Sequence, residues 1–486
     1  MSKYFLGIDQ GTTGVTALLC DINFTPVARG YCEIAQLYPR AGWVEHDPED
    51  IWRSVKAATA EAMKKASAHP SDIIAIGIDH EGESVLLWDK ESGRAVYPSI
   101  VWQDKRTQSR AEELEAEYGD LFRKRTALSP DSYFSATKIE WVLKNIQASD
   151  SVISGNNDAW ILYKMTGGRA HKTDASTASR TMLYNIESGT WDKELCDILG
   201  IDIGILPEIG DSARDFGVSD PDEFLGISAP ISAMLNDQQA ALLGQGCVRK
   251  GMLKTTYGTG CFILINTGDE PVRSENGLVT TVAWQIGGRR TFALDGGVYI
   301  AGAAISWLRD GLGIIESPKE CEAICKSVPD NGGVYFVPAF SGLAAPYCDP
   351  NARGLITGLT ASTTRAHIVR AAEEAIAYQV ADLVRIIERD ADIEIPLMRC
   401  DGGAVRDGFL MQFGSDIMNI PLEIPSCTEA TARGVAFAAA VGVGLAELSD
   451  AEKLFDAEKR YTPSMPDDER LRLKNEWKNA IEMIIK

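Results

Sequence analysis

Apolar residues at the start of the chain fall into short runs that are typical of β-strands. Three such runs, over residues 4–9, 15–21 and 27–34, are separated by glycine-rich or polar turns. Their length and the turns between them predict three strands joined as consecutive hairpins. A helical pattern over 48–68 and an apolar run over 73–78 then predict a helix and a fourth strand. Hairpins followed by alternating strands and helices predict a mixed α/β sheet rather than a purely parallel one.

The second half of the chain repeats this opening. Residues 254–260 read Lys-Thr-Thr-Tyr-Gly-Thr-Gly, which is again a strand that enters a turn of glycine and threonine. Three apolar runs then predict further strands, at 261–266, 278–284 and 291–294. The repeat predicts two similar α/β halves with a cleft between them. Because glycines punctuate the chain around 245–250, we expect domains at 1–246 and 247–486.

The charge balance narrows the class of partner. The 486 residues are too many for one core, and they carry 48 basic and 69 acidic side chains, a formal net charge of −21. A chain of this sign repels nucleic-acid backbones and anionic membrane surfaces, so we expect neither as a partner. A small neutral substrate is favoured. An anionic nucleotide would need a local site of backbone donors and a metal ion.

No segment of the sequence indicates targeting to a membrane. The first six residues lack the basic, apolar and small-residue regions of a signal peptide. No apolar run approaches the roughly 18 residues that a membrane-spanning helix needs, so we expect a cytoplasmic protein. Among the ten cysteines, the closest pair, Cys321 and Cys325, lacks the second pair or nearby histidine of a zinc site. We therefore expect reduced thiols.

The first predicted hairpin has the composition of a phosphate-binding turn, since residues 9–14 read Asp-Gln-Gly-Thr-Thr-Gly. Gly11 and Gly14 are expected to turn the backbone with positive φ and to let it approach an anion closely. The neighbouring hydroxyls and N–H groups can donate to phosphate oxygens. Asp9 would repel a polyphosphate unless a cation lay between them, and Mg²⁺ suits that position. An ordinary hairpin with a glycine turn is the alternative.

Two further turns join a predicted strand to a predicted helix. Asp237 follows an apolar segment and begins a helical run, where its carboxylate either caps backbone N–H groups or faces a ligand. Gly402 and Gly403 lie between a strand and a helix predicted over 409–418. They either leave room for a flat group such as a nucleotide base or form a simple tight turn. Each turn taken alone favours the purely structural interpretation.

Eight short segments of the chain together indicate a family. They lie at 42–48, 100–104, 133–138, 179–183, 237–242, 257–261, 338–343 and 401–405. In this order they resemble the FGGY carbohydrate kinases, and within that family most closely the glycerol kinases, over nearly the whole chain. Each segment alone is a weak signal, whereas eight in the family's order leave little room for coincidence.

The resemblance implies two actin-like ATPase domains with ribonuclease-H-like cores, which close around ATP and a small polyhydroxy substrate. It implies an ATP- and Mg²⁺-dependent kinase that phosphorylates a hydroxyl of a small polyol or sugar. Asp237 would be the catalytic base that accepts the proton of the attacking hydroxyl, and Asp9 would lie near Mg²⁺. Phosphate or nucleotide contacts are implied for Thr12, Thr13, Thr259, Gly260, Gly302 and Gly403. A homodimer or homotetramer is also suggested.

The substrate loop departs from the glycerol kinases. They carry the sequence Asn-Gln-Arg-Glu-Thr, whose Arg-Glu pair binds glycerol hydroxyls, whereas residues 80–84 here read His-Glu-Gly-Glu-Ser. Glu83 keeps the acidic partner, but Gly82 removes five donors and leaves space. Lost donors to a buried hydroxyl cost about 1–3 kcal/mol, so we expect a substrate larger than glycerol, with glycerol as the alternative. The other implied substrate contacts match the family: Trp102, Tyr133, Asp237, Gln238 and Phe262.

Two positions near the implied nucleotide base also depart from the family. Asp407 stands where the family has an asparagine, and Ser306 replaces a neighbouring glutamine. Both residues are expected to line the nucleotide site. Strict preference for adenine does not follow from them.

Two alternatives from other classes remain open. The same fold and phosphate hairpins occur in ATP-driven modules of the actin or chaperone type, which bind proteins instead of a small substrate. Asp79, Glu81 and Glu83 alternate along an extended segment and could share one face, where they would hold a second metal ion, as in a metal-dependent hydrolase. Ordinary contacts with solvent or hydroxyl groups are the simpler interpretation of these acids.

Overall fold

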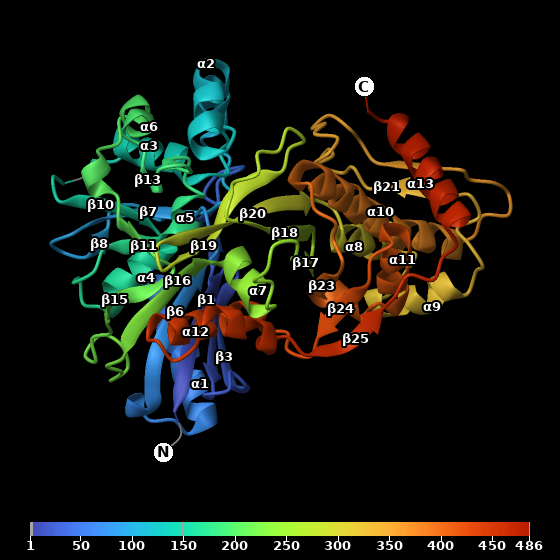
Figure 1. Cartoon of the computed structure of the whole chain (residues 1–486). Coiled ribbons are helices and arrows are strands. Elements are labelled where there is room, and N and C mark those ends of the chain that lie inside the picture. The colour runs from blue at the N-terminus through green and yellow to red at the C-terminus, as the bar shows by residue number, and fades with distance from the viewer. Residues whose placement is uncertain (1–2, 148, 486) are drawn as a thin grey trace.

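The computed structural model describes residues 3–147 and 149–485 and consists of two α/β parts that lie side by side (Figure 1). The first part is formed by the N-terminal half of the chain and the second by the C-terminal half. Helix α12 (Ala430–Gly442) is an exception, because it returns to the first part and packs on its sheet. Within the described residues, no helix combines the length and apolar character that crossing a membrane requires.

The central sheet of the first part has six strands. Their spatial order is β15 (Ala213–Val218), β16 (Pro230–Asn236), β6 (Ile73–His80), β1 (Tyr4–Gly11), β2 (Gly14–Cys20) and β3 (Pro26–Glu33). The pairs β1–β2 and β2–β3 are antiparallel, whereas β6 runs parallel to β1, and β16 parallel to β6. The mixed sheet predicted from the opening hairpins is therefore confirmed.

Helices cover both faces of this sheet. The predicted helix near residue 48 is α1 (Pro48–Ala66), which packs with alternate residues of the strands, and α12 packs with the others. Close approach of α12 requires glycine in the strands beneath it. A Cβ on Gly7 would lie 2.0 Å from the carbonyl oxygen of Ala432, and one on Gly77 would lie 2.2 Å from that of Val435. A side chain at either position would push the helix off the sheet.

Helix α7 (Asp237–Gly244) packs directly against α12. A Cβ on Gly244 would lie 1.9 Å from the carbonyl oxygen of Ala430, and one on Gly434 would lie 2.0 Å from that of Ala240. The two backbones therefore touch. Because α7 begins at Asp237, a segment almost 200 residues later in the sequence holds the predicted catalytic base in place.

The second part is built on a seven-stranded sheet. The order is β19 (Val279–Ile286), β20 (Arg289–Val298), β18 (Cys261–Gly268), β17 (Leu253–Tyr257), β23 (Met398–Asp401), β24 (Leu422–Pro425) and β25 (Ala457–Tyr461). The predicted second hairpin is confirmed, since β17 and β18 are antiparallel, and β23 runs parallel to β17 just as β6 runs parallel to β1. Its helices are α8 (Gly302–Asp310), α9 (Cys321–Lys326), α10 (Arg365–Ala391), α11 (Gly408–Met418) and α13 (Asp467–Glu482).

The first part carries an additional layer beside its central sheet (Figure 1). Its strands are β4 (Gln36–Leu37), β5 (Glu45–His46), β7 (Val85–Asp89), β8 (Arg94–Ala95), β9 (Ser99–Ile100) and β10 (Val152–Asn156). Short pairs join β11 (Lys172–Asp174) to β14 (Glu208–Gly210), β12 (Tyr184–Asn185) to β13 (Thr190–Trp191), and, in the second part, β21 (Tyr335–Val337) to β22 (Leu355–Thr357). The helices of this layer are α2 (Gln108–Thr126), α3 (Ser135–Asn145), α4 (Asn157–Met165), α5 (Ala175–Ala178) and α6 (Lys193–Leu199).

The helical pattern over 104–118 predicts a helix that begins at Asp104, but α2 begins four residues later. Asp104 is instead a buried loop residue, whose carboxylate accepts the backbone N–H of Val44 at 2.6 Å and binds the guanidinium of Arg106. These tertiary contacts replace the first helical turn. The layer that carries Trp102 is anchored by them.

Candidate active site

The first hairpin turn contacts a predicted substrate residue. The hydroxyl of Thr12 accepts a hydrogen bond from the indole N–H of Trp102 at 3.0 Å. Thr13 is exposed beside it. The predicted phosphate turn and the predicted aromatic wall of the substrate site are therefore adjacent.

The expected backbone conformation of this turn is wrong. Neither Gly11 nor Gly14 has positive φ. Gly14 is needed for a different reason, because a Cβ there would lie 2.5 Å from the hydroxyl oxygen of Tyr31 on the neighbouring strand. The requirement for glycine at this position comes from close packing of strands, which the local sequence does not reveal.

Three aspartates meet where neighbouring parallel strands end. Asp9 of β1 lies opposite Asp79 of β6, and Asp79 lies opposite Leu235 of β16, two residues before Asp237. Parallel strands present their carboxyl ends at one edge of the sheet, the usual place for a ligand in α/β proteins. Burial raises the pKa of Asp9 to about 6, although a hydrogen bond with Asp79 opposes this shift.

Asp79 is the member of this cluster that the sequence indicated only as a possible ligand of a second metal ion. Its side chain is fully buried, and burial, followed by the charges of Asp9 and Asp237, raises its pKa well above the usual value. This shift favours the protonated form of Asp79, which can donate a hydrogen bond to Asp9. Within the described residues, no N–H or hydroxyl donor reaches its oxygens.

The two alternatives for Asp237 can now be compared. The side chain of Asn236, not that of Asp237, caps α7 by accepting the N–H of Gln238 at 3.3 Å. The carboxylate of Asp237 is thus left for another role. Burial raises its pKa to about 7, the negative charges of Asp9 and Glu83 add to this shift, and Lys254 opposes it. The effects of Asp9 and Glu83 link Asp237 electrostatically to the phosphate turn and to the substrate loop.

Gly82 adopts a conformation that favours glycine. Its φ is +84°, and a Cβ would lie 2.8 Å from the side-chain nitrogen of Asn236. The carbonyl oxygen of Gly82 accepts from the side chain of Asn156 at 3.0 Å. The space that we expected beside Gly82 is therefore partly filled by Asn236, and the loop is held tightly.

Glu83, the acidic residue kept in the substrate loop, pairs with a cation from a distant segment of the sequence. The guanidinium Nε of Arg180 donates to Oε1 of Glu83 at 2.5 Å, and Nη2 donates to the hydroxyl of Tyr133 at 3.2 Å. The ring of Tyr133 packs against Trp102 with centroids 5.8 Å apart. Glu83, Tyr133 and Trp102 therefore lie together as predicted. Arg180 joins them, and although segment 179–183 carried the resemblance, no role was predicted for this residue.

The other two predicted substrate residues come from separate elements. Gln238, in the first turn of α7, accepts from the buried ammonium group of Lys254 at 2.5 Å, and Lys254 also donates to Thr256 at 3.1 Å. Lys254 lies on β17, so it links the two parts beside Asp237. Phe262 on β18 is 39% exposed and lies opposite Gly297.

The second hairpin is bonded to a helix N-terminus. The carbonyl oxygen of Thr259 accepts from the N–H groups of Ala301 and Ala303, and the carbonyl oxygen of Gly258 accepts from Gly302 at 3.1 Å. A Cβ on Gly302 would lie only 2.6 Å from the oxygen of Gly258. Thr259 and Gly302 are thus brought together as the resemblance implied. The adjoining Gly260 has its own close contact, since a Cβ would lie 2.5 Å from the carbonyl oxygen of Val298.

The paired glycines after β23 pack against the same hairpin. Gly402 has φ +95°, and a Cβ would lie 2.3 Å from the carbonyl oxygen of Tyr257. A Cβ on Gly403 would meet no described atom within 4 Å, so space remains beside this residue. Both predicted properties of this turn are present: it is tight, and it leaves room.

Ser306 and Asp407 are less directly connected to these groups. Ser306 is half-buried in α8. Asp407 caps α11, because its Oδ1 accepts the N–H groups of Phe409 and Leu410 at 2.9 Å, and burial raises its pKa. Capping of α11 therefore accounts for one of the two carboxylate oxygens of Asp407.

The alternating acids of the substrate loop do not form a common site. Asp79 faces Asp9, and Glu83 pairs with Arg180, whereas Glu81 accepts from Asn157 at 3.0 Å. In the part of the chain that the structure describes, no group of three or more histidine, cysteine or acidic side chains is arranged to hold a metal ion. A second metal site at these acids has no support.

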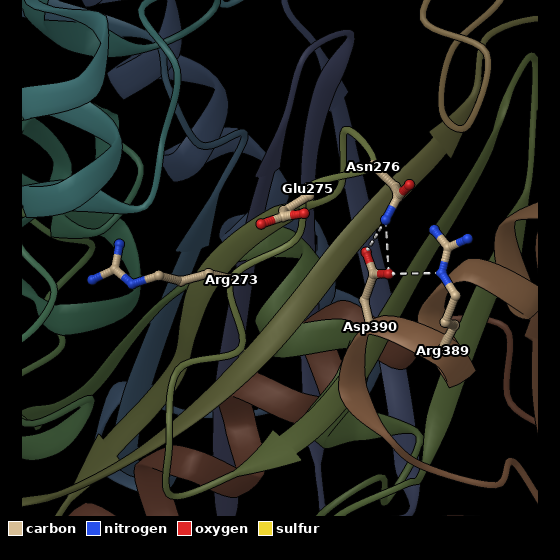
Figure 2. A pocket seen from close by; sticks show the side chains of 5 residues that line it. All are labelled: Arg273, Glu275, Asn276, Arg389 and Asp390. Carbon is tan, nitrogen blue, oxygen red and sulfur yellow. Dashed lines mark hydrogen bonds and ion pairs between the residues drawn. The ribbon is translucent and has the colours of Figure 1, made fainter.

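The surface hollow shown in Figure 2 lies away from this region. It encloses about 390 Å³ and is lined by Arg273, Glu275, Asn276, Arg389 and Asp390. Asp390 accepts from Asn276 and pairs with Arg389. None of the predicted site residues lines it, so it is not part of the candidate active site.

Comparison with known proteins gives the same family for both parts of the chain. Residues 4–244 match the N-terminal domain and residues 253–443 the C-terminal domain of the FGGY family of carbohydrate kinases. Glycerol kinase 2 of Thermotoga maritima is 47% identical and covers 99% of this chain and 98% of its own. Glycerol kinase of Carboxydothermus hydrogenoformans is 45% identical, with coverage of 99% and 97%.

Solved structures agree in fold. Plasmodium falciparum glycerol kinase with ADP superposes with a TM-score of 0.94 at 33% identity, covering 100% of this chain and 99% of its own. Gluconate kinase of Lactobacillus acidophilus has the same fold, with a TM-score of 0.89 at 22% identity and coverage of 99% and 98%. The predicted pair of actin-like, ribonuclease-H-like domains is confirmed. The chain belongs to the FGGY family of carbohydrate kinases, which are ATP-dependent phosphotransferases that act on a hydroxyl group.

Proposed function

We propose that this kinase phosphorylates glycerol at a primary hydroxyl group, with Asp237 as the catalytic base. The environment of Asp237 carries the proposal, because Asn236 supplies the side-chain cap of α7 and the carboxylate of Asp237 interacts electrostatically with both Asp9 and Glu83. The names of the relatives, glycerol kinases at 47% and 45% identity over nearly the full chain, support the choice of substrate.

Phosphoryl transfer requires the protein mainly to position the reactants and to neutralise charge. A glycerol hydroxyl is a weak nucleophile at neutral pH, and Asp237 accepts its proton as the oxygen bonds to the terminal phosphorus of ATP and the bond to ADP breaks. A base with a pKa near 7 is well matched to this task, since about half of it is ionised at neutral pH and it retains affinity for a proton.

Glu83, Tyr133, Trp102, Gln238 and Phe262 are proposed to hold the substrate. Glu83 and Tyr133 supply polar groups, and Trp102 supplies an apolar wall that adjoins the phosphate turn through its bond to Thr12. An exposed Phe262 would cover the other side of a small polyol. The site thus combines few polar groups with aromatic surface, as sites for small neutral ligands do.

The structure weakens the basis of the expected larger substrate. Asn236 partly fills the space beside Gly82, and Arg180 brings a guanidinium to Glu83. The relatives give no support to a substrate larger than glycerol. Glycerol, which we first considered as the alternative, is therefore the proposed substrate.

Asp9 is the proposed ligand of Mg²⁺. The buried carboxyl group of Asp79, whose oxygens have no donor within the described residues, fits a place for a cation beside Asp9. Mg²⁺ takes one or two carboxylates together with waters and substrate phosphates, so no larger protein cluster is needed. When bound, it would neutralise charge on the phosphates.

The nucleotide is proposed to lie along the glycine-rich turns of both parts. Its contacts would be Thr12, Thr13, Thr259, Gly260, Gly302, Ser306, Gly403 and Asp407. The open space beside Gly403 supports a flat group there. Domains at 1–246 and 247–486, a cytoplasmic location and a homodimer or homotetramer stay predictions.

Replacement of Asp237 tests the mechanism. Asp237→Asn should lower kcat by about 10²–10⁴-fold, the usual contribution of a positioned base, and should leave ATP binding by calorimetry within a few-fold of native. Asp158→Asn is the matched control, because burial raises the pKa of Asp158 to about 7 as well, and its carboxylate bonds to Thr173 and lies 3.7 Å from His80. Native turnover in Asp237→Asn would refute the proposed base.

A further inference from the structure

Arg180 is the most constrained cation beside the proposed substrate site. It follows the short helix α5 and is 4% exposed. Its guanidinium pairs with Glu83 and Tyr133 on one side and with Asp295 of β20 at 3.1 Å on the other. It also lies over the ring of Phe134 at 5.6 Å. Arg180 is therefore held by both parts of the molecule at once.

The directions of these hydrogen bonds decide what Glu83 and Tyr133 can offer a ligand. Arg180 donates to Oε1 of Glu83, which leaves Oε2 as an acceptor without a donor among the described residues. Arg180 also donates to the oxygen of Tyr133, which keeps the phenolic proton available for donation. Burial raises the pKa of Tyr133 well above its usual value, so that this proton is retained at neutral pH.

A second observation points to a ligand at this place. The Nη1 group of Arg180 is buried and has no acceptor within the described residues. A buried donor without a partner is costly, and an oxygen atom supplied by a substrate would relieve that cost. The same three side chains thus provide an acceptor, a donor and an unsatisfied N–H group.

From this arrangement we propose that Arg180 is a positioning residue that sets the polarity of the substrate site. It presents Glu83 as the acceptor and Tyr133 as the donor to one hydroxyl of the substrate that is not the one phosphorylated. A hydroxyl group both donates and accepts, so this pair matches it completely. Arg180 thereby makes the site select a polyol over an alcohol that lacks this hydroxyl.

The backbone keeps the pair at a fixed separation. The ammonium group of Lys138, which is fully buried, donates to the carbonyl oxygens of both Glu83 and Tyr133, at 3.2 Å and 2.6 Å. The hydroxyl of Ser135 also donates to the carbonyl oxygen of Glu83, at 3.2 Å. With the two backbones tied, the guanidinium is the group that contacts both the Glu83 carboxylate and the Tyr133 hydroxyl.

This inference rests on the proposed function, and a substrate series separates the two. The native enzyme and the variant Arg180→Lys are compared with glycerol, propane-1,2-diol and propane-1,3-diol, each of the diols lacking one hydroxyl. Lysine keeps the charge near Glu83, but it cannot hold Glu83 and Tyr133 with a planar fork. The quantity measured is the ratio of kcat/KM for glycerol to that for each diol.

The matched control is Arg106→Lys. Arg106 is also fully buried, pairs with the carboxylates of Asp104 and Glu45, and donates to the hydroxyl of Tyr97. It thus has an environment similar to that of Arg180, and none of its three polar partners is a proposed substrate contact. Both lysine variants are expected to lose thermal stability, so stability alone does not distinguish them.

The expected result is specific to the substrate. Native enzyme and Arg106→Lys should prefer glycerol to at least one diol by tenfold or more, and Arg180→Lys should reduce that preference to less than about threefold. A merely structural role would lower kcat/KM for all three substrates by a common factor. An unchanged preference in Arg180→Lys would overturn the inference.

A second variant keeps the test decisive if Arg180→Lys does not fold. Tyr133→Phe removes the proposed donor, which also accepts from Arg180 Nη2, and leaves the ion pair of Arg180 with Glu83 in place, so it should reduce the same preference as strongly. A native preference in Tyr133→Phe would also overturn the inference. If the native enzyme phosphorylates another polyol and not glycerol, the proposed substrate has failed, and the same comparison is made with that polyol and its deoxy analogues.

Discussion

The two glycine-threonine hairpins of this kinase share a topology and differ in what they offer a ligand. In the first part, Asp9 lies two positions before Gly11, and its carboxyl group faces Asp79 and Asp237. In the second part, Thr256 lies two positions before Gly258, at the place that corresponds to Asp9. A carboxylate in one hairpin is matched by a hydroxyl in the other.

The hairpins also differ in their surroundings. The first is bonded to the indole of Trp102 and thus to the proposed substrate site. The second accepts N–H groups from the start of α8 through Gly258 and Thr259. The same local fold therefore serves two tasks: one copy carries charged groups for phosphoryl transfer, and the other fixes a helix start against the proposed nucleotide site. Repetition of a motif does not imply repetition of chemistry.

Removal of the Asp9 carboxylate should give the largest difference between the two hairpins. Asp9→Asn should lower kcat by about 10²–10³-fold, because it removes a group proposed to stabilise the transferring phosphate through Mg²⁺. Thr256→Val, the corresponding change in the second hairpin, should lower kcat by only a few-fold. Steady-state kinetics across a range of Mg²⁺ concentrations would measure both. Equal losses in the two variants would contradict the division of tasks.

A methyl group at the start of α8 should affect the nucleotide side alone. Gly302→Ala brings a Cβ to within 2.6 Å of the oxygen of Gly258, so the second hairpin must move. Because displacement of a site by about 1 Å can cost up to 10²-fold, we expect the KM for ATP to rise at least about tenfold while the KM for glycerol stays near native.

Gly403→Ala provides the contrast to that change. No atom of the described residues lies within 4 Å of the added Cβ, so thermal stability should be native, and a nucleotide occupying this space would contact the methyl group. An unchanged KM for ATP in Gly403→Ala would argue against a base at this position. A fall in the affinity for glycerol in Gly302→Ala would show that the two sides are not separable.

The last test of the comparison uses the acid limb of the pH profile of kcat/KM. Because burial raises the pKa of Asp237 to about 7, the carboxyl group is protonated below that pH and cannot accept a proton. The kcat/KM for glycerol should therefore fall about tenfold for each pH unit below 7. Thr256→Val should keep this profile, whereas a profile that stays flat down to pH 5 would exclude Asp237 as the base.

Much of the fold follows from local patterns. The opening hairpins, the second glycine-threonine hairpin, α11 and the start of α7 at Asp237 were all predicted, because apolar periodicity and turn residues act over a few positions. The order of eight short segments was enough to identify the family and the reaction. The grouping of Trp102, Tyr133 and Glu83 came from that resemblance and not from any property of the isolated segments.

Other features depend on contacts between distant segments. Gly14 is required by the hydroxyl of Tyr31 and not by positive φ, and the space expected beside Gly82 is partly filled by Asn236. The start of α2 was misplaced because Asp104 binds the N–H of Val44. In each case a group far away in the sequence decided the local structure, and no pattern around the residue itself records it.

The sequence by itself determined the two-part α/β architecture, the membership of a kinase family and most of the residues proposed for its site. Only the tertiary structure decided that Arg180 pairs with Glu83, that Asp79 joins Asp9, and that α12 supports the helix beginning at Asp237. The physical reason is range: strand and helix patterns arise from neighbouring residues, whereas ion pairs, carboxyl contacts and glycine-mediated packing arise where separate elements meet.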